Sequence, residues 1–452
     1  RKERGAPKVR DDLIGWTSCV ISFVLKEVRD LFFRVSPLSS DSSACVLKEM
    51  DLDRRIAASI YGAVTAVLAA VVVIAEEELI ADGRSCRRPR SRRFSMRQSL
   101  FAVADLNSAF DNGWFLNAFR CHKSSFESIY QLIEQKWDLI NEEIGHNAVF
   151  YIRDRVAVTL YYLTHAGSLS EAAQVFGMSK SSASRYVREV TDVIIDCLSQ
   201  QFIKLPQNRA DREWAILTEG FESICGFPNC CLAMDGSLFE IERPNEFFGW
   251  YCRKGYPAIN CQLVVDHKAR IRSYDMRPGS ANDKSIFNYS DFGKNILEIL
   301  PDRHFVVADA GYNLSKYVMI PYPIENQMTA QQSLYNYLHS RTRIIVERSI
   351  GILKNRFRIL KLPLNQKKDS FNGRDQTSQM ARVLESCFVV HNILIDLADE
   401  VGASGAHFPE EDDASDTERE QYYRVAPDAG VIRDGIAQYL YENKHLLKAT
   451  YG

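Results

Sequence analysis

The sequence lacks an excess of charge of either sign. Its 452 residues carry 56 Lys and Arg against 58 Asp and Glu, a formal net charge of −2. Binding of nucleic acid through overall charge is therefore excluded, and any such binding must come from local basic patches. Hydrophobic residues make up 46% and charged residues 25% of the chain, which excludes a wholly disordered, collagen-like or polytopic membrane protein. The length is sufficient for two or three domains.

The cysteines lack the spacing of a disulfide or zinc framework. There are 11 of them, an odd number, and no two form a C-x-x-C pair. This pattern indicates a reducing compartment with free thiols. We therefore expect the cysteines to be small buried hydrophobic residues and not ligands.

No signal-peptide pattern precedes the longest uncharged run, Ile56–Ala75. The run is long enough to span a bilayer. Because it is rich in Ala and three glutamates follow it directly, we favour a helix docked on a core over a membrane span. The chain begins with Arg1 and its first methionine is Met50. We expect a fragment or an upstream extension, and whether residues 1–49 are native stays open.

We predict five parts along the chain. They are an N-terminal extension with an apolar helix and an Arg-rich linker (1–100), a helical region (101–204), an α/β domain (225–398), an acidic disordered linker (399–428) and a C-terminal helix (429–452).

The Arg-rich linker contains six arginines within Arg84–Arg93. A solvated linker, an arm that contacts phosphates and a nuclear-targeting patch are all compatible with this composition.

The helical region contains a helix-turn-helix pattern. Tyr151–Thr164 and Ser168–Phe176 are predicted helices, Gly177 allows a tight turn, and Lys180–Val190 is a third helix. The third helix presents polar side chains suited to phosphates and base edges: Lys180, Ser181, Ser182, Ser184, Arg185 and Arg188. An ordinary helical hairpin is the alternative. DNA binding is favoured because short polar side chains let a helix enter a groove.

After residue 228 the pattern becomes that of a mixed α/β domain. Four apolar segments bounded by Gly, Pro and Asn are predicted strands: Cys230–Gly236, Ala258–Asp266, Arg270–Met276 and His304–Gly311. Three further segments are predicted helices: 282–299, 330–360 and 376–398. This order indicates a central sheet covered by helices.

Acidic residues stand out in this domain. Asp235 and Asp309 each follow an apolar strand, which places them at the sheet edge where open α/β folds bind ligands. Glu347 lies among apolar residues of a predicted helix, where a charge costs stability unless it pairs or binds a cation. Two divalent ions can hydrolyse a phosphodiester, and hard ions such as Mg²⁺ prefer carboxylate ligands. For any one aspartate, a turn or cap residue is the alternative.

Five segments in this order resemble the PIF/Harbinger superfamily of DDE transposases, which includes the Harbinger transposase-derived nucleases. They are Met234–Pro244, Tyr251–Ile271, Arg277–Phe287, Val307–Leu314 and Val346–Leu360.

The resemblance implies an RNase H-like nuclease domain that cleaves DNA with a divalent metal cation, Mg²⁺ or Mn²⁺. Asp235, Asp309 and Glu347 match the catalytic acids of the family. Asp283 matches a fourth acidic position and is a further expected metal ligand, although it could instead cap the helix that begins near Lys284. Departures from the family pattern leave every carboxylate in place.

Basic residues surround the predicted catalytic glutamate. Arg341–Lys368 contains nine basic residues and one acid, Glu347, so this segment can hold a DNA backbone. Lys354 and Arg358 are expected to share the helix face of Glu347 and to contact DNA. His339, near the helix of Glu347, is expected to be a structural or a surface histidine.

The leading hypothesis is a DDE transposase that hydrolyses DNA strands and joins the freed 3′ ends to target DNA. The alternatives are a domesticated nuclease without transposition and a DNA-binding regulator on an inactive nuclease scaffold. The expected partner is double-stranded DNA, both transposon ends and target. The resemblance also implies a Myb-like accessory protein, and a homo-oligomer and nuclear localisation are further expectations. No membrane is favoured.

Overall fold

The computed structural model describes residues 99–102, 111–165, 167–244, 248–324, 327–365, 375–400 and 427–445. All of them lie in one unit of the chain, Arg93–Gly452. The apolar run and the Arg-rich linker of the N-terminal extension fall outside the described residues, as does most of the predicted acidic linker. In the part of the chain that the structure describes, no helix is long and apolar enough to cross a membrane.

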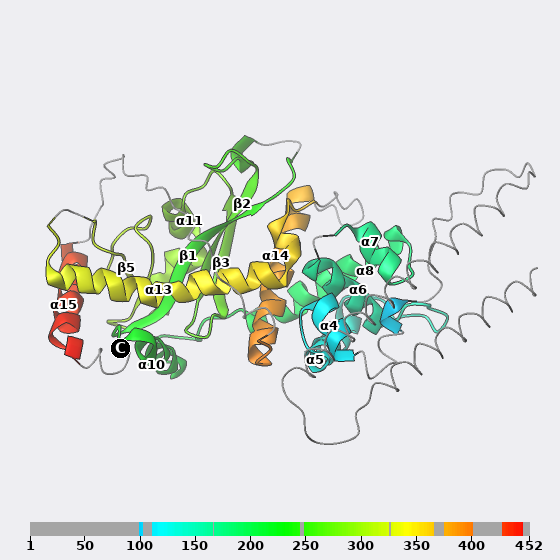
Figure 1. Ribbon diagram of the computed structural model, residues 1–452, viewed down its shortest axis with the longest axis horizontal. Coiled ribbons are helices and arrows are strands. Elements are labelled where there is room, and N and C mark those ends of the chain that lie inside the picture. The colour runs from blue at the N-terminus through cyan, green and yellow to red at the C-terminus, as the bar shows by residue number, and fades with distance from the viewer. Residues whose placement is uncertain are drawn as a thin grey trace, which may run out of the picture. The chain divides into compact units, whose positions relative to one another are not determined.

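A five-stranded mixed sheet lies at the centre of the α/β region (Figure 1). Its strands are β1 (Cys230–Glu240), β2 (Ala258–Val265), β3 (Ile271–Pro278), β4 (Phe305–Val307) and β5 (Val318–Met319). The spatial order is β3-β2-β1-β4-β5. The first three strands pair antiparallel, whereas β4 and β5 run parallel to β1. The four predicted strands are confirmed, and β5 is an additional strand too short to leave a sequence pattern.

Two strands differ in length from their prediction. β1 continues to Glu240, which pairs with Ala258 of β2, so Asp235 lies within a strand and not at its end. β4 contains only three residues. It ends because Asp309 forms a turn, in which its Oδ1 accepts a hydrogen bond from the backbone N–H of Gly311 at 3.0 Å. The expectation that both acids lie at strand ends is therefore wrong for Asp235.

Long helices cover the sheet. α10 (Glu213–Cys225) and α13 (Ala330–Arg356) contact β1, and α14 (Gln376–Asp396) contacts β3. Figure 1 shows α13 crossing the strands. Every residue of β2 is buried, including the polar Asn260 and Gln262, as is usual for a strand covered on both faces.

The predicted helix at 282–299 is divided in two. α11 (Asp283–Tyr289) and α12 (Asp291–Ile299) meet at Ser290. The Ser290 hydroxyl accepts a hydrogen bond from the backbone N–H of Gly293 at 2.9 Å and so begins a second helix.

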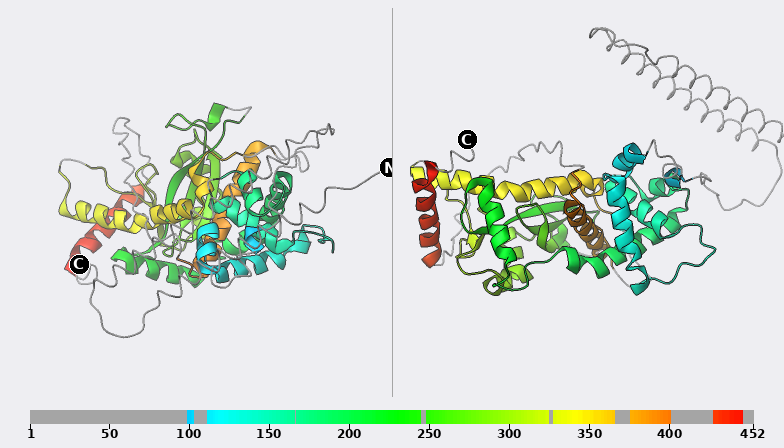
Figure 2. Two further views of the ribbon diagram at one scale, coloured as in Figure 1. Left: turned by 45° about the vertical axis from the view of Figure 1, so that its right-hand side comes forward. Right: turned by 90° about the horizontal axis from the view of Figure 1, so that it is seen from below.

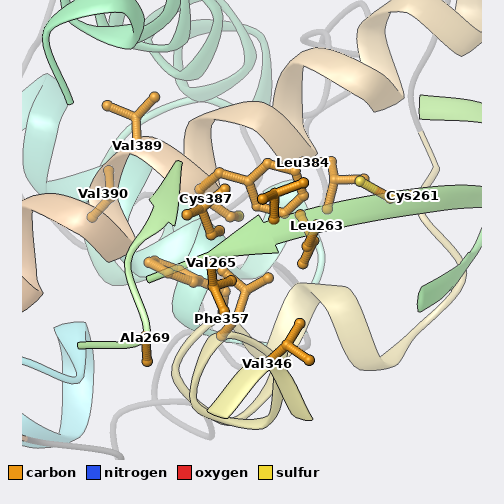
Figure 3. Close-up of a cluster of buried hydrophobic side chains, with 14 of the residues drawn as sticks. Cys261, Leu263, Val265, Ala269, Val346, Phe357, Leu384, Cys387, Val389 and Val390 are labelled. Atoms are coloured by element: carbon orange, nitrogen blue, oxygen red, sulfur yellow. The ribbon is translucent and has the colours of Figure 1, made fainter. Parts of the chain in front are cut away.

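The core of the α/β region lies where α13 and α14 meet β2. Figure 3 shows Leu263 and Val265 of β2 beside Val346 of α13 and Leu384 and Cys387 of α14. All five side chains are buried. Cys121, Cys230, Cys231, Cys252, Cys261 and Cys387 are free and buried, and Cys197 is free and partly buried, in agreement with the expected role of the cysteines as small hydrophobic residues.

The preceding region is helical, as predicted. Its helices are α4 (Asp111–Phe119), α5 (Lys123–Glu134), α6 (Ile152–Thr164), α7 (Leu169–Val175) and α8 (Lys180–Val193), with a short 3-10 turn η1 (Trp137–Leu139) and a continuation of α8 through η2 (Ile194–Leu198) and α9 (Ser199–Phe202). Ser168 and Ser179 cap α7 and α8 by accepting backbone hydrogen bonds. Between these two helices Gly177 has a φ of 66°, a conformation that favours glycine.

The helical region and the α/β region pack against each other through α14. This helix contacts α5, α8, α9 and η2. Arg382 of α14 donates to Asp192 of α8 at 2.6 Å and to Asp196 of η2 at 3.0 Å. One continuous set of buried side chains therefore extends through both regions.

The C-terminal helix α15 (Pro427–Glu442) docks on α13, as expected (Figure 2). Its Asp434 accepts a hydrogen bond from the Tyr322 hydroxyl at 2.6 Å. The guanidinium of Arg433 lies 3.9 Å from the centre of the same ring.

A buried ion pair links the end of α13 to the segment after α14, next to the start of α5. Arg356, the last residue of α13, donates to both the carboxylate and the backbone carbonyl of Asp399, which follows α14. Both side chains are buried. The Asp399 carboxylate also accepts the backbone N–H of His122, just before α5, at 2.9 Å. Because the pair is fully desolvated, each member depends on the other.

We expect Asp399→Ala to lower the free energy of unfolding by about 3–5 kcal/mol, because it leaves the Arg356 charge buried without its partner. Urea unfolding measures the change. Asp396→Ala is the matched control: it breaks a partly exposed pair with Arg270 and should cost less than about 1 kcal/mol. Equal losses in the two variants would contradict this role of Asp399.

Candidate active site

Asp235 and Asp309 lie side by side because β1 and β4 are parallel neighbours. Ala233 of β1 pairs with Val307 of β4, and each aspartate follows its paired residue by two positions. Asp235 is thus on the central strand of the sheet, with its side chain 18% exposed. Its Oδ1 accepts the backbone N–H of Gly236 at 2.8 Å. The two strands therefore bring together the first two predicted acids.

Asp283 joins them from the start of α11. A Cβ atom built on Gly236 would lie 2.2 Å from Asp283 Oδ1, so only glycine permits the carboxylate to approach β1 this closely. Asn260 of β2 donates to Asp283 Oδ1 at 3.4 Å. The side chain that caps α11 is that of Asn282, which accepts the backbone N–H of Ser285 at 2.8 Å. Asp283 is therefore not the helix cap that the sequence left as its alternative role.

Tyr312 lies among these three aspartates, a role that the sequence analysis missed. The phenol is buried, and its oxygen accepts a hydrogen bond from Gln262 Nε2 at 3.0 Å. Burial raises the pKa of Tyr312 well above its ordinary value, and the Asp283, Asp235 and Asp309 carboxylates raise it further. A polar residue such as Gln262 within an otherwise apolar strand was the signal that could have indicated a buried polar site.

The Asp235 carboxyl has a strongly shifted pKa. Burial raises the pKa to about 7, the Arg343 guanidinium opposes this, and Asp309 and Asp283 add to it. Crowded, desolvated carboxylates of this kind are typical of functional sites.

Glu347 is connected to this group through Arg343. From α13, Arg343 Nη1 donates to Asp235 Oδ2 at 2.7 Å, and its Nη2 lies 2.5 Å from Glu347 Oε1. Glu347 is 45% exposed, because the helix directs the neighbouring Ile345 and Val346 into the core and Glu347 outward. The apolar neighbours in sequence therefore do not surround its carboxylate, and its charge is paired.

The carboxylates fit a hard divalent cation in their chemistry, since all four donors are carboxylate oxygens. Three of them gather at Gly236 and Tyr312, where their mutual repulsion favours a cation. Within the described ranges, however, no three His, Cys, Asp or Glu side chains are arranged to hold a metal ion. The positive charge between Asp235 and Glu347 is instead that of Arg343.

The sequence predicted that Lys354 and Arg358 share the helix face of Glu347, and this is wrong for Arg358, which lies beyond the helix. Lys354 is partly buried, donates to the backbone carbonyl of Leu238 in β1 at 3.3 Å, and places its ammonium 5.0 Å from the centre of the Phe239 ring. α13 ends at Arg356, so Arg358 lies in the following turn η4 (Arg358–Lys361), where it is exposed. The sequence analysis predicted one helix over 330–360 and so missed the end of α13 before Arg358.

His339 has the structural role that was expected. It is buried, and its Nε2 lies 3.0 Å from the backbone carbonyl of Met319. Burial lowers its pKa to about 4, so the ring is neutral at physiological pH.

α8, which the sequence analysis predicted as the third helix of a helix-turn-helix, has one buried side. Ala183, Val187 and Val190 of α8 are buried. The opposite side carries the predicted DNA-contacting residues, which are exposed or partly buried: Lys180, Ser181, Ser182, Ser184, Arg185 and Arg188. Arg185 is 54% exposed and lies 3.6 Å from Glu189.

The α/β region is similar to known proteins. Residues 234–392 match the family described as DDE superfamily endonuclease. HARBI1 of Mus musculus, named as a candidate nuclease, is 26% identical over 280 residues, 61% of this chain and 76% of the relative. The ALP1-like protein of Arabidopsis thaliana is 27% identical over 311 residues, 63% of this chain and 71% of the relative. No solved structure matches the chain significantly.

We expect the metal-free protein to lose stability as the pH rises from about 4 to about 7. The pKa of the Asp235 carboxyl is raised from its ordinary value of 3.8, which applies to the unfolded chain, to about 7 in the folded chain. Between these two pKa values the folded state binds more protons than the unfolded state. The free energy of unfolding therefore falls by up to about 1.4 kcal/mol per pH unit as the pH rises. Urea unfolding in chelator across this range measures the slope.

Asp235→Asn removes the titrating group and should flatten the pH dependence of the free energy of unfolding. Asp291→Asn changes an exposed carboxylate at the start of α12 and should keep the wild-type slope. A slope in Asp235→Asn equal to that of the wild type would contradict the assignment.

Proposed function

We propose that the chain is a divalent-metal-dependent endonuclease acting on double-stranded DNA, since residues 234–392 match the family of DDE superfamily endonucleases. One observation carries the proposal. The parallel strands β1 and β4 set Asp235 beside Asp309, Asp283 closes over Gly236, and Arg343 ties Glu347 to Asp235. These are the four acids of the predicted site.

Asp235, Asp283, Asp309 and Glu347 are the residues that would hold Mg²⁺ or Mn²⁺. The bound ions would supply an activated water and stabilise the leaving 3′ oxygen of the phosphodiester. The Asp235 carboxyl must be ionised to act as a ligand, so binding should strengthen as the pH rises through about 7.

Tyr312 supports the site from the segment between β4 and β5. Gln262 donates to the phenol oxygen, which leaves the hydroxyl hydrogen of Tyr312 to donate to an oxygen in the site. Because its pKa is raised, the phenol stays protonated and neutral. It therefore adds a hydrogen-bond donor among the carboxylates without adding charge.

The sheet supports an RNase H-like assignment. Three antiparallel strands continue into two parallel strands in the order β3-β2-β1-β4-β5, with the first acid on the central strand. A helix from the other part of the domain, α13, brings the last acid across the sheet to β1.

The helices α6, α7 and α8 are the proposed DNA-binding element. α8 packs on α6 and α7 through its apolar side, and its outer side carries Lys180, Arg185 and Arg188. This arrangement suits a helix that enters the major groove. Arg358 on η4 is a further proposed phosphate contact. Lys354 is a weaker one, because its ammonium already contacts β1.

The domain is compatible with a transposase and with a domesticated nuclease derived from one. Cleavage needs only the acids and the helices, whereas transposition also requires the freed 3′ hydroxyl to attack a phosphate of target DNA. Terminal inverted repeats flanking the gene would separate the two. We retain a nuclear protein, a Myb-like accessory protein and a homo-oligomer as parts of the transposase proposal. A regulator on an inactive scaffold would bind DNA and not cleave it.

We expect wild-type protein to cleave DNA that carries the flanking repeat ends only when Mg²⁺ or Mn²⁺ is present. Glu347→Gln should lower the cleavage rate by about 10²-fold or more because a metal ligand is lost. Its melting temperature in chelator should be unchanged or higher, because the pair with Arg343 is partly exposed and contributes little. Metal should raise the melting temperature of the wild type more than that of the variant.

Glu298→Gln, at an exposed position of α12, is the matched control and should cleave like the wild type. A Glu347→Gln variant that melts earlier in chelator, and loses cleavage only in proportion to unfolding, would show that Glu347 is merely structural.

DNA binding and DNA cleavage should depend on different residues. Arg185→Ala should weaken DNA binding and reduce the slope of log K against log salt by about one, because one phosphate contact is lost. Fluorescence anisotropy at several salt concentrations measures this, and cleavage of DNA already bound should persist. Arg212→Ala, an exposed arginine ahead of α10, is the control. Wild-type affinity and slope in Arg185→Ala would reject α8 as the binding element.

A further inference from the structure

Arg343 contacts two of the four carboxylates at once. Its Nη1 atom is 2.7 Å from Asp235 Oδ2 on β1, and its Nη2 atom is 2.5 Å from Glu347 Oε1 on its own helix. One guanidinium therefore bridges the two elements that the proposed chemistry must bring together. The side chain is 21% exposed, so solvent screens these contacts only in part.

A guanidinium in this position acts on the acids in the same direction as a bound cation, because its positive charge lowers the pKa of Asp235. Arginine stays protonated at every accessible pH, so its charge is present whenever the acids are ionised. It offsets the repulsion between Asp235 and the nearby aspartates, and it makes two charge-assisted hydrogen bonds.

The same contacts oppose a metal ion. A ligand oxygen of Asp235 that already accepts a hydrogen bond from Arg343 must give it up, or share it, to coordinate a divalent ion. A dication approaching Asp235 and Glu347 would also be repelled by the guanidinium between them.

We propose that Arg343 is a built-in counter-cation, a positioning residue that holds Asp235 and Glu347 together without metal and competes with the divalent ion for them. The inference rests on the proposed metal-dependent function. It implies that the site binds metal more weakly than its four acids alone would, and that metal binding moves the Arg343 guanidinium away from Asp235. This accounts for the absence, among the described residues, of a carboxylate group already arranged for a metal ion.

Mn²⁺ binding to the full chain, measured by isothermal titration calorimetry, tests the competition. Arg343→Gln keeps a hydrogen-bonding side chain but removes the charge, and it should bind Mn²⁺ about tenfold tighter or more. Arg343→Lys keeps the charge, but its single ammonium cannot bond both carboxylates in the way that the guanidinium does. Its affinity for Mn²⁺ should therefore fall between those of the wild type and the glutamine variant.

Arg348→Gln is the matched control. It removes the same charge from an exposed position of the same helix and should change the affinity by about twofold at most, because exposed charges are screened. Thermal unfolding in chelator is a second readout. Arg343→Gln should melt below the wild type without metal and gain more from added Mn²⁺, whereas Arg348→Gln should match the wild type in both.

The outcomes separate this inference from the proposed function. Tighter Mn²⁺ binding by Arg343→Gln, with Arg348→Gln unchanged, supports the competition. Saturable binding by the wild type, with equal or weaker binding by Arg343→Gln, overturns it and leaves the metal-dependent nuclease intact. No saturable binding by the wild type or by either Arg343 variant overturns both.

Discussion

The parallel pairing of β1 with β4 is the constraint on which the site depends. It places Asp235 and Asp309 next to each other at the point where β4 ends. The side of β1 that carries Asp235 is then fixed, since a slip of one residue would turn the carboxylate to the opposite face. Asp283 can reach the same place only because position 236 is glycine. Local backbone geometry thus brings three carboxyl groups together before any cofactor is considered.

α13 connects this charge to the rest of the molecule. Its middle places Arg343 and Glu347 against β1, its end buries Arg356 with Asp399 beside α5, and α15 packs on it as well. The positions of Glu347 and Arg343 are therefore set by packing along a 27-residue helix and not by a loop. A helix fixed in this way suits a site that must hold its acids in a defined geometry.

Much of this arrangement could be predicted from the sequence, because it follows from local patterns. Apolar runs located four strands, and Asp235, Asp309 and Glu347 were recognisable from their motifs. The end of β1 and the break before Arg358 could not be predicted, since they depend on pairing with β2 and on the packing of α13. The role of Tyr312 and the contact of Arg343 with Asp235 were missed because each is defined by residues distant in sequence.

The central claim is that these four acids form one divalent-metal site. Anomalous diffraction from crystals of the protein grown with Mn²⁺ and a DNA end tests it most directly. The account predicts an anomalous peak at about 2.0–2.6 Å from carboxylate oxygens of Asp235 and Asp309, with the Arg343 guanidinium withdrawn from Asp235. A structure in which Mn²⁺ is absent from these carboxylates, and Arg343 still bridges Asp235 and Glu347, would contradict it.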